Sequence, residues 1–307
     1  MNTHALVGRR PPARAGAAHA WDRLNRALFV FSAAAVALTV FAIILFLGLQ
    51  GLAAFRSISP LEFFLSTRWQ PPEQYGAATF IVGSLAVTAL ALLVGAPLGL
   101  AGAIVLSELA GPRLRAVLRP AVDLFVGIPS VVYGWIGLTI FVPFIRDRLA
   151  GGGSGFGLLA AGVILGIMIL PTVIGIAEDA LRAVPRPLVE GSLALGATRW
   201  QTIWRVLVPA ARPGILAGII LAMARAIGET MAVQMVIGNS PRLPVSLWTP
   251  TATLTSEIVT EMGNAPYGTP WADALFFMAF LLLLISLGLI LAVRALGRRA
   301  AYASGRG

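Results

Sequence analysis

Residues 190–209 read Glu-Gly-Ser-Leu-Ala-Leu-Gly-Ala-Thr-Arg-Trp-Gln-Thr-Ile-Trp-Arg-Val-Leu-Val-Pro and form a polar island between two long apolar stretches. Pro187 suits the first turn of a helix and Gly196 tolerates the left-handed exit from one, so the first half predicts a short helix. Thr198 and Gln201 have the spacing of a capping box, which predicts that a second helix starts at Thr198. The segment therefore predicts a rigid pair of short helices.

The second of these helices carries large apolar side chains at helical intervals. Their spacing predicts that they share one face, and they are Trp200, Ile203, Trp204 and Leu207. The alternative interpretation is an ordinary amphipathic helical hairpin that lies on a membrane surface.

Composition excludes a soluble domain. Of the 307 residues, 58% are hydrophobic and 12% are charged, and the mean hydropathy is +0.86. Too little polar surface exists to cover a core. Six apolar runs are each long enough for the roughly 20 residues that a spanning helix needs. They predict an all-α membrane protein with six transmembrane helices, near residues 28–50, 79–107, 120–145, 157–177, 213–238 and 274–296.

Arginine placement predicts the orientation of these helices. The N-terminal arm and the second, fourth and sixth connections hold 17 arginines, the opposite side holds 5, and Arg225 lies inside a span. By the positive-inside rule, both termini and the 190–209 loop are cytoplasmic. The predicted organisation is a disordered cytoplasmic arm, a first transmembrane helix with its extracytoplasmic loop, a membrane core and a cytoplasmic tail, over residues 1–27, 28–78, 79–297 and 298–307.

The net charge of +10 does not indicate nucleic-acid binding. The arginines are spread along the membrane edges instead of forming a patch with aromatic residues. The partner that this charge pattern predicts is the lipid bilayer.

Several residue types that carry chemistry are absent. Cysteine is absent, which excludes thiolate metal sites and cysteine nucleophiles, and His4 and His19 both lie in the N-terminal arm. All 23 basic residues are arginine, so no phosphate-binding loop with its lysine can form. We therefore expect no metal site, no catalytic residue and no cofactor in this chain, and any ATP and Mg²⁺ must be bound by a partner subunit.

The fifth apolar run contains a charged residue at its centre. Arg225 lies about 18 Å into the run, near the middle of a roughly 30 Å hydrocarbon core. Glu229 is expected one turn further on the same face, where it can neutralise the arginine. One interpretation is a structural ion pair that holds helices together.

The other interpretation is an anion site at the membrane midplane. Arginine offers a planar fork of donors that suits tetrahedral oxyanions. The Glu229 carboxylate would repel sulfate but could accept a hydrogen bond from a phosphate that still carries a proton. This reasoning favours phosphate.

The third apolar run contains a predicted break. Pro129 cannot donate a hydrogen bond to the carbonyl of Phe125, and Ser130 and Tyr133 follow closely. Such irregular backbone is tolerated at membrane depth where it packs in protein or lines a cavity. We place Asp123, near the inner end of the run, at the membrane interface instead of the pathway.

Small residues repeat every four positions in the fifth run, at Gly214, Gly218 and Ala222. This spacing lets helices approach closely and predicts a stripe that faces another helix. A lipid-facing stripe that reflects only the alanine-rich composition is the alternative.

The 190–209 segment resembles the cytoplasmic coupling loop of ABC-transporter permeases. Its pattern is Glu-Ala-Ala, three residues, Gly, nine residues, Ile, one residue and Leu-Pro. Glu190, Gly196 and Pro209 match that spacing. Small residues replace the two alanines and valines replace Ile and Leu, at Gly191, Ser192, Val206 and Val208.

Residues 123–134 and 225–239 sharpen the resemblance to one family, the PstC-type permease subunits of bacterial phosphate ABC importers. The similarity runs from about residue 28 to 297. It implies a type I ABC importer permease fold in the bacterial plasma (inner) membrane. It also implies a sister permease that forms a heterodimer with this chain, two ATP-binding subunits at the coupling loop and a soluble extracytoplasmic phosphate-binding protein.

The resemblance also implies functional residues. The substrate-pathway candidates are Arg225, Glu229, Thr230 and Ser130. The candidates for coupling to the ATPase are Glu190, Gly196, Trp200, Trp204 and Pro209. The function implied is transport without covalent chemistry. Two alternatives remain open, namely a permease for another oxyanion such as molybdate, sulfate or a phosphonate, and a membrane sensory or scaffold subunit that reports transporter state. The binding protein has two candidate docking loops, 51–78 and 239–273.

Overall fold

The computed structural model describes residues 13–149, 151 and 153–304. The chain divides into two compact units, residues 1–49 and 50–307. The described part of the first unit belongs to one long helix, α1 (Ala13–Ala53). The arm predicted to be disordered is therefore helical over residues 13–27, because alanine, leucine and arginine favour a helix that continues into the apolar run. Residues 1–12 of the predicted arm lie outside the described residues.

The second unit begins with short elements between α1 and the next span. These are η1 (Ala54–Arg56), α2 (Pro60–Leu65), β1 (Trp69–Gln70) and β2 (Gln74–Tyr75), the two strands pairing antiparallel with Trp69 opposite Tyr75. The next spans are formed by α3 (Ala78–Ile104), η2 (Val105–Leu109), α4 (Pro112–Gly127), α5 (Ser130–Ile136), η3 (Gly137–Phe141), α6 (Val142–Arg148) and α7 (Leu158–Arg182).

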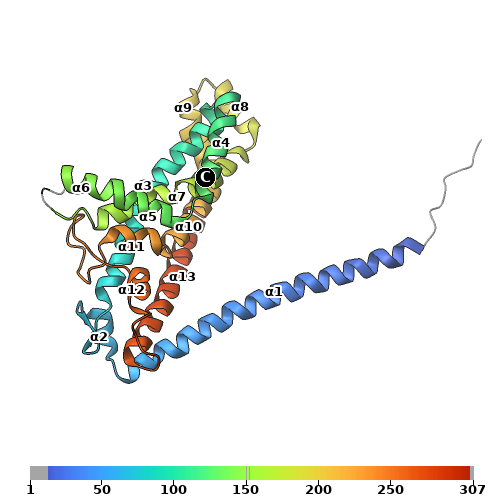
Figure 1. Ribbon diagram of the computed structural model, residues 1–307. Helices are drawn as coiled ribbons and strands as arrows, with labels where there is room; N and C mark the ends of the chain where they lie inside the picture. The colour runs from blue at the N-terminus through green and yellow to red at the C-terminus, as the bar shows by residue number, and fades with distance from the viewer. Residues whose placement is uncertain (1–12, 150, 152, 305–307) are drawn as a thin grey trace, which may run out of the picture. The chain divides into compact units, whose positions relative to one another are not determined.

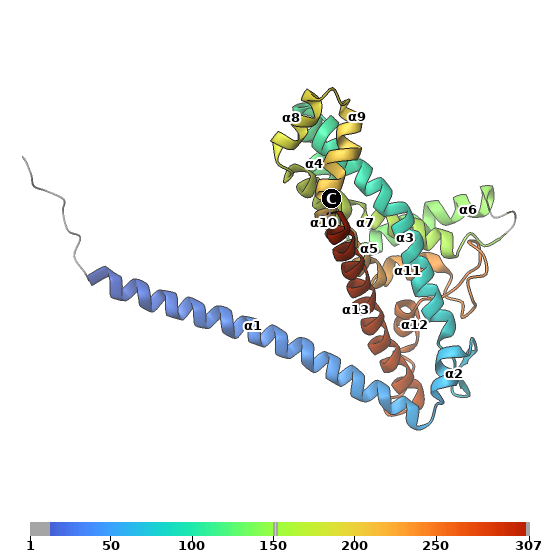
Figure 2. The same ribbon diagram turned by 180° about the vertical axis from the view of Figure 1, so that it is seen from behind.

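The second half of this unit contains the polar island and the last spans. Its elements are α8 (Arg186–Ala194), α9 (Arg199–Thr202), η4 (Ile203–Leu207), α10 (Val208–Ile227), α11 (Met231–Ile237), α12 (Leu254–Glu261) and α13 (Pro270–Ser304). Figures 1 and 2 show α8, α9 and α4 at one end of this unit and α2 at the other. The helix α13 extends through most of the predicted tail.

Among the described residues, five helices are long and apolar enough to cross a membrane, or six if the bent helix pair counts as one span. This confirms the six predicted spans, but two of them are broken. In the third span, the segments 112–127 and 130–148 meet at 97°. In the fifth span, α10 ends at Ile227 and α11 begins at Met231. The prediction of one continuous helix over 213–238 is therefore wrong.

The core of the second unit forms around α7, which packs between α3 and α10. A methyl group added at Gly95 of α3 would lie 2.7 Å from the carbonyl oxygen of Gly166 in α7. On α10, a methyl group at Gly214 would collide with Ala180, and one at Gly218 would lie 3.1 Å from Ile176 Cβ. The small-residue stripe of α10 therefore faces α7, which confirms the prediction that it faces another helix.

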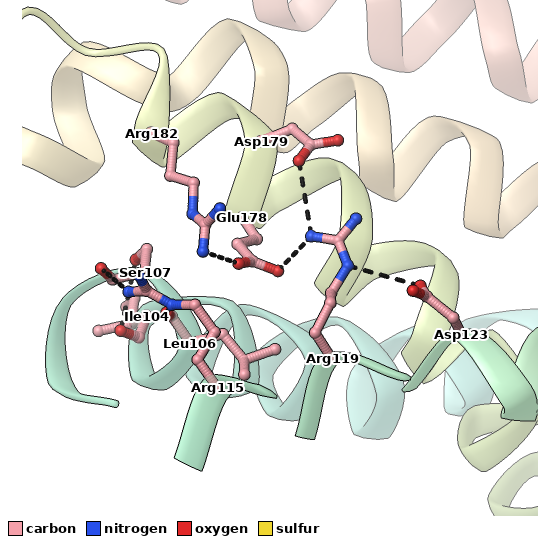
Figure 3. Close-up of polar contacts among 9 residues, drawn as sticks. All are labelled: Ile104, Leu106, Ser107, Arg115, Arg119, Asp123, Glu178, Asp179 and Arg182. Carbon is pink, nitrogen blue, oxygen red and sulfur yellow. Dashed lines mark hydrogen bonds and ion pairs between the residues drawn. The ribbon is translucent and has the colours of Figure 1, made fainter. Parts of the chain in front are cut away.

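A charged cluster joins α4 to α7 (Figure 3). The Glu178 side chain is fully buried, its Oε2 lies 2.6 Å from Arg119 Nη1, and its Oε1 lies 2.7 Å from Arg182 Nη2. Arg119 also pairs with Asp123 at 3.5 Å and Asp179 at 3.7 Å. The helix α4 has no buried residue, and its polar contacts include these ion pairs with α7 and two hydrogen bonds of 2.8 Å from Arg115 to the carbonyls of Leu106 and Ser107.

We predict that Glu178→Ala destabilises the protein strongly. The change removes a fully buried carboxylate from Arg119 and Arg182, which are 34% and 42% exposed. Because water screens the two arginines, we expect a cost of about 2 kcal/mol. Thermal unfolding of the purified protein in lipid nanodiscs measures the effect. The matched control is Asp123→Asn, whose side chain is 62% exposed and whose loss costs under about 1 kcal/mol. Equal decreases in unfolding temperature in the two variants would show that the attachment of α4 does not depend mainly on Glu178.

Candidate functional site

Arg225 lies near the end of α10 and is half-buried. Its Nη1 donates a long hydrogen bond of 3.4 Å to Thr172 Oγ1 of α7. The guanidinium also interacts electrostatically with the hydroxyl of Tyr133 on α5. Among the ion pairs of the described residues, none includes Arg225. The cation is therefore held by neutral groups, and its remaining donors can bind an anion.

Glu229 does not lie one turn beyond Arg225 on the same helix, so that prediction is wrong. The helix α10 stops at Gly228, and Glu229 lies in the break before α11. Its Oε1 accepts a 3.2 Å hydrogen bond from the backbone N–H of Ala232. Glu229 takes this position because the first N–H groups of α11 lack helical partners. Its carboxylate satisfies one of these N–H groups and complements the helix dipole.

The break between α10 and α11 is held by hydroxyl groups. Thr255 of α12, which is 6% exposed, donates to the Glu229 carbonyl at 3.1 Å. Thr230 donates to the Gly228 carbonyl at 3.3 Å. Carbonyls freed by a helix break at membrane depth need such internal donors. Thr255 was missed by sequence reasoning, since no local spacing marks a partner 26 residues away.

The break in the third span is closed in a similar way. Pro129 removes the helical donor to the Phe125 carbonyl, and the Tyr133 hydroxyl replaces it at 2.8 Å. Ser130 is the first residue of α5 and is half-buried. A methyl group at Gly134 would lie 3.0 Å from Ala232 Cα, so α5 packs directly on α11. The two broken spans therefore meet.

The predicted pathway residues occupy this junction. Arg225, Glu229 and Thr230 lie at the α10–α11 break, and Ser130 lies at the break of the other span. The contacts in the described chain do not join Ser130 to the other three, and its role stays a prediction.

We predict that Tyr133→Phe destabilises the protein by about 1 kcal/mol, because the half-buried hydrogen bond from the Tyr133 hydroxyl to the Phe125 carbonyl is lost. Thermal unfolding in nanodiscs measures the change. Thr139→Val is the control, since the exposed Thr139 hydroxyl bonds a carbonyl within its own helical segment and its loss costs under about 0.5 kcal/mol. A stability of Tyr133→Phe equal to that of the control would show that the carbonyl finds another partner.

The polar island forms the predicted pair of short helices. Gly196 has a φ of +85°, the left-handed conformation expected at the end of α8. Gln201 N–H donates to Thr198 Oγ1 at 3.2 Å and Thr198 N–H donates to Gln201 Oε1 at 2.9 Å, which confirms the capping box. The hydroxyls of Ser192 and Thr202, 3.0 Å apart, join the two helices.

The four large apolar residues of the second helix do not share one face. Ile203 and Leu207 are buried at 3% and 2% exposure, whereas Trp200 and Trp204 are 58% and 46% exposed. Their indole rings pack edge to face with centroids 5.7 Å apart. Three of the four residues lie in the π-helical segment η4 and Trp200 lies in α9, so the regular α-helical spacing behind the prediction does not hold here. Leu195, 91% exposed, adds a third apolar residue that the sequence did not single out.

The other predicted coupling residues lie on α8 and at the start of α10, on either side of the exposed tryptophans in the sequence. Glu190 is exposed on α8, and Pro209 is half-buried at the start of α10. The helix α10 therefore connects the polar island directly to Arg225.

The two loops at the opposite end form one surface. The indole Nε1 groups of Trp69 and Trp271 donate to the same Glu261 Oε2, at 3.3 and 2.8 Å. A recess of about 500 Å³ is lined by residues from both loops, including Glu62 and Glu73. Burial and the nearby Glu261 carboxylate raise the pKa of Glu257 to about 7. The structure makes the loops parts of one surface instead of alternatives.

The chain is similar to known membrane transport proteins. The family model described as binding-protein-dependent transport system inner membrane component matches residues 95–302. The chain is 48% identical over 275 residues to the probable ABC transporter permease protein YqgH of Bacillus subtilis, which covers 88% of this chain and 87% of that protein. It is 38% identical over 251 residues to the phosphate transport system permease protein PstC of Mesorhizobium japonicum, with 76% of each chain covered.

Solved structures agree on the fold. A bacterial ABC transporter that imports the acidic polysaccharide alginate superposes with a TM-score of 0.62 at 18% identity, covering 92% of this chain and 99% of that chain. The inward-facing MetNI methionine ABC transporter gives a TM-score of 0.56 at 22% identity, with 76% and 99% covered. These likenesses support the fold of an ABC importer permease.

Proposed function

This chain belongs to the family of binding-protein-dependent transport system inner membrane components, and we propose that it is the PstC-type permease subunit of an inorganic phosphate importer. Family membership makes it a multi-pass inner membrane permease and not an enzyme. The identity to permeases named for phosphate transport supports the substrate. In this proposal the chain forms half of the translocation pathway.

The observation that carries the proposal is the Arg225 guanidinium at the junction of two broken spans, which belongs to none of the ion pairs among the described residues. Its planar donors match the oxygens of a tetrahedral oxyanion, and the low dielectric of the site strengthens each bond. Glu229 stands at the same break with one carboxylate oxygen on Ala232 N–H. Its other oxygen can accept a hydrogen bond from a protonated phosphate, while its charge repels sulfate.

The proposal includes the partners. A sister permease completes the pathway, and two ATP-binding subunits, which hold ATP and Mg²⁺, grip the coupling surface formed by α8, α9 and η4. A phosphate-binding protein docks on the two joined extracytoplasmic loops. ATP-driven closure pushes on the coupling surface, and α10 transmits the movement so that the Arg225 region faces outward and then inward.

Two other functions are alternatives to phosphate import. The relative YqgH carries no substrate in its name, which keeps another oxyanion such as molybdate, sulfate or a phosphonate as the second candidate. A sensory or scaffold subunit is the third. The sensory function predicts that Arg225→Gln leaves signalling intact while transport is lost.

We predict that Arg225→Gln abolishes ATP-dependent uptake of labelled phosphate into proteoliposomes that contain the complete transporter. Glu229→Gln is expected to keep phosphate uptake but to lose discrimination against sulfate, because the repelling charge is gone. The control is Arg113→Gln, an exposed arginine on α4, with unchanged uptake. Size-exclusion chromatography of each complex separates loss of transport from loss of assembly. Normal uptake and selectivity in both site variants would refute the anion site.

We predict that replacing Trp200 and Trp204 together by alanine weakens binding of the ATP-binding subunit about thirtyfold or more, since large aromatic side chains dominate protein interfaces. Titration of labelled ATP-binding subunit onto the permease heterodimer in nanodiscs measures the affinity. Trp135→Ala on α5 is the matched control, because Trp135 is 60% exposed but lies outside the coupling surface. An affinity equal to that of the control would exclude the tryptophan pair from the interface.

A further inference from the structure

An apolar groove of about 590 Å³ runs between α10 and α13, with Ile176 of α7 at its side. One face of α10 forms its wall, at positions three, four, seven, eight and eleven residues beyond Pro213. This wall combines small or cyclic residues with bulky ones. The surface is recessed where the side chains are small. The residues of the wall are Pro213, Leu216, Ala217, Ile220, Leu221 and Ala224. A volume of this size is typical of pockets that enclose small organic ligands.

The length of the groove matches one leaflet of a bilayer. From Pro213 to Ala224 the helix rises about 16 Å at 1.5 Å per residue, close to half of a roughly 30 Å hydrocarbon core. Pro213 lies near the start of α10, on the side of the polar island, and Ala224 adjoins Arg225. The groove therefore runs from the inner membrane surface to the midplane.

The groove is lined by a positive charge at the end of the candidate membrane span Pro270–Ala295. Arg294 of α13 lines it beside Ile290 and Val293, and its side chain is exposed. The ion pairs found in the described part of the chain do not include Arg294. The groove thus presents apolar walls over one leaflet and a cation at the level of the lipid headgroups.

This combination favours one occupant over another. An apolar helix of a second membrane subunit would fill the walls but would cover Arg294 without supplying a negative charge, which is costly. An anionic phospholipid supplies both parts, since its acyl chain follows the walls and its phosphate accepts hydrogen bonds from the guanidinium.

We infer that the α10–α13 groove is an inner-leaflet binding site for an anionic phospholipid, with the phosphate on Arg294 and one acyl chain along α10. The site is separate from the proposed phosphate pathway and does not depend on the transported substrate. Because α10 begins where the coupling surface ends and carries Arg225, a lipid in this groove would contact the helix that links them.

The absence of cysteine in the chain allows a direct test. Ala217→Cys places one thiol in the groove of the assembled transporter, and mass spectrometry of this chain follows its reaction with a membrane-permeant maleimide in nanodiscs. We expect phosphatidylglycerol to slow labelling about tenfold relative to phosphatidylcholine with identical acyl chains. Adding Arg294→Gln should remove that difference, while adding Arg113→Gln should keep it.

Three results would overturn the inference. Equal labelling in the two lipids would show that the groove does not select anionic headgroups. A difference that persists in the Arg294→Gln variant would remove this arginine from the site. Labelling that is blocked in both lipids in the assembled transporter, but proceeds in this chain before the sister permease binds, would assign the groove to the subunit interface.

Discussion

Backbone polar groups that leave a helix at membrane depth must find partners inside the protein, because the hydrocarbon offers none. Two spans of this permease are broken, after Gly127 and after Ile227. The Tyr133 hydroxyl satisfies the first break, and Thr255 and the Glu229 carboxylate satisfy the second. These groups concentrate polarity where α5 packs on α11. The same arrangement provides a setting in which Arg225 is held without an opposite charge.

The helix α10 connects the two functional regions of the chain. It begins at the polar island, where the capping box and the exposed tryptophans shape the surface, and it ends beside Arg225. Its glycine stripe packs against α7, which carries Thr172 and Glu178. A movement imposed on the island would therefore reach the Arg225 region through closely packed helices. The ion pairs of Glu178 join α4 to the same framework.

Local features of the fold could be predicted from the sequence, and tertiary ones could not. The capping box depends on residues three apart, and the break at Pro129 depends on a missing donor. Both are visible in a short window. The helix end at Gly228 was missed because the apolar pattern continues to residue 238, and only a carboxylate acceptor after the glycine hinted at a new helix start. The contact between Glu178 and Arg119 spans 59 residues, and no spacing rule foretells it.

We propose that the transported oxyanion binds Arg225. Solid-state NMR of the complete transporter, with ¹⁵N-labelled arginine in this chain and phosphate supplied by the binding protein, measures this contact through ¹⁵N–³¹P dipolar coupling to the inorganic phosphate signal, which is resolved by chemical shift from the phospholipid signal. We expect a coupling that corresponds to an N–P distance of about 4 Å or less, consistent with a charge-assisted hydrogen bond, and its loss in Arg225→Lys. A coupling that is absent under turnover-trapped conditions, or that persists in the Arg225→Lys variant, would contradict it.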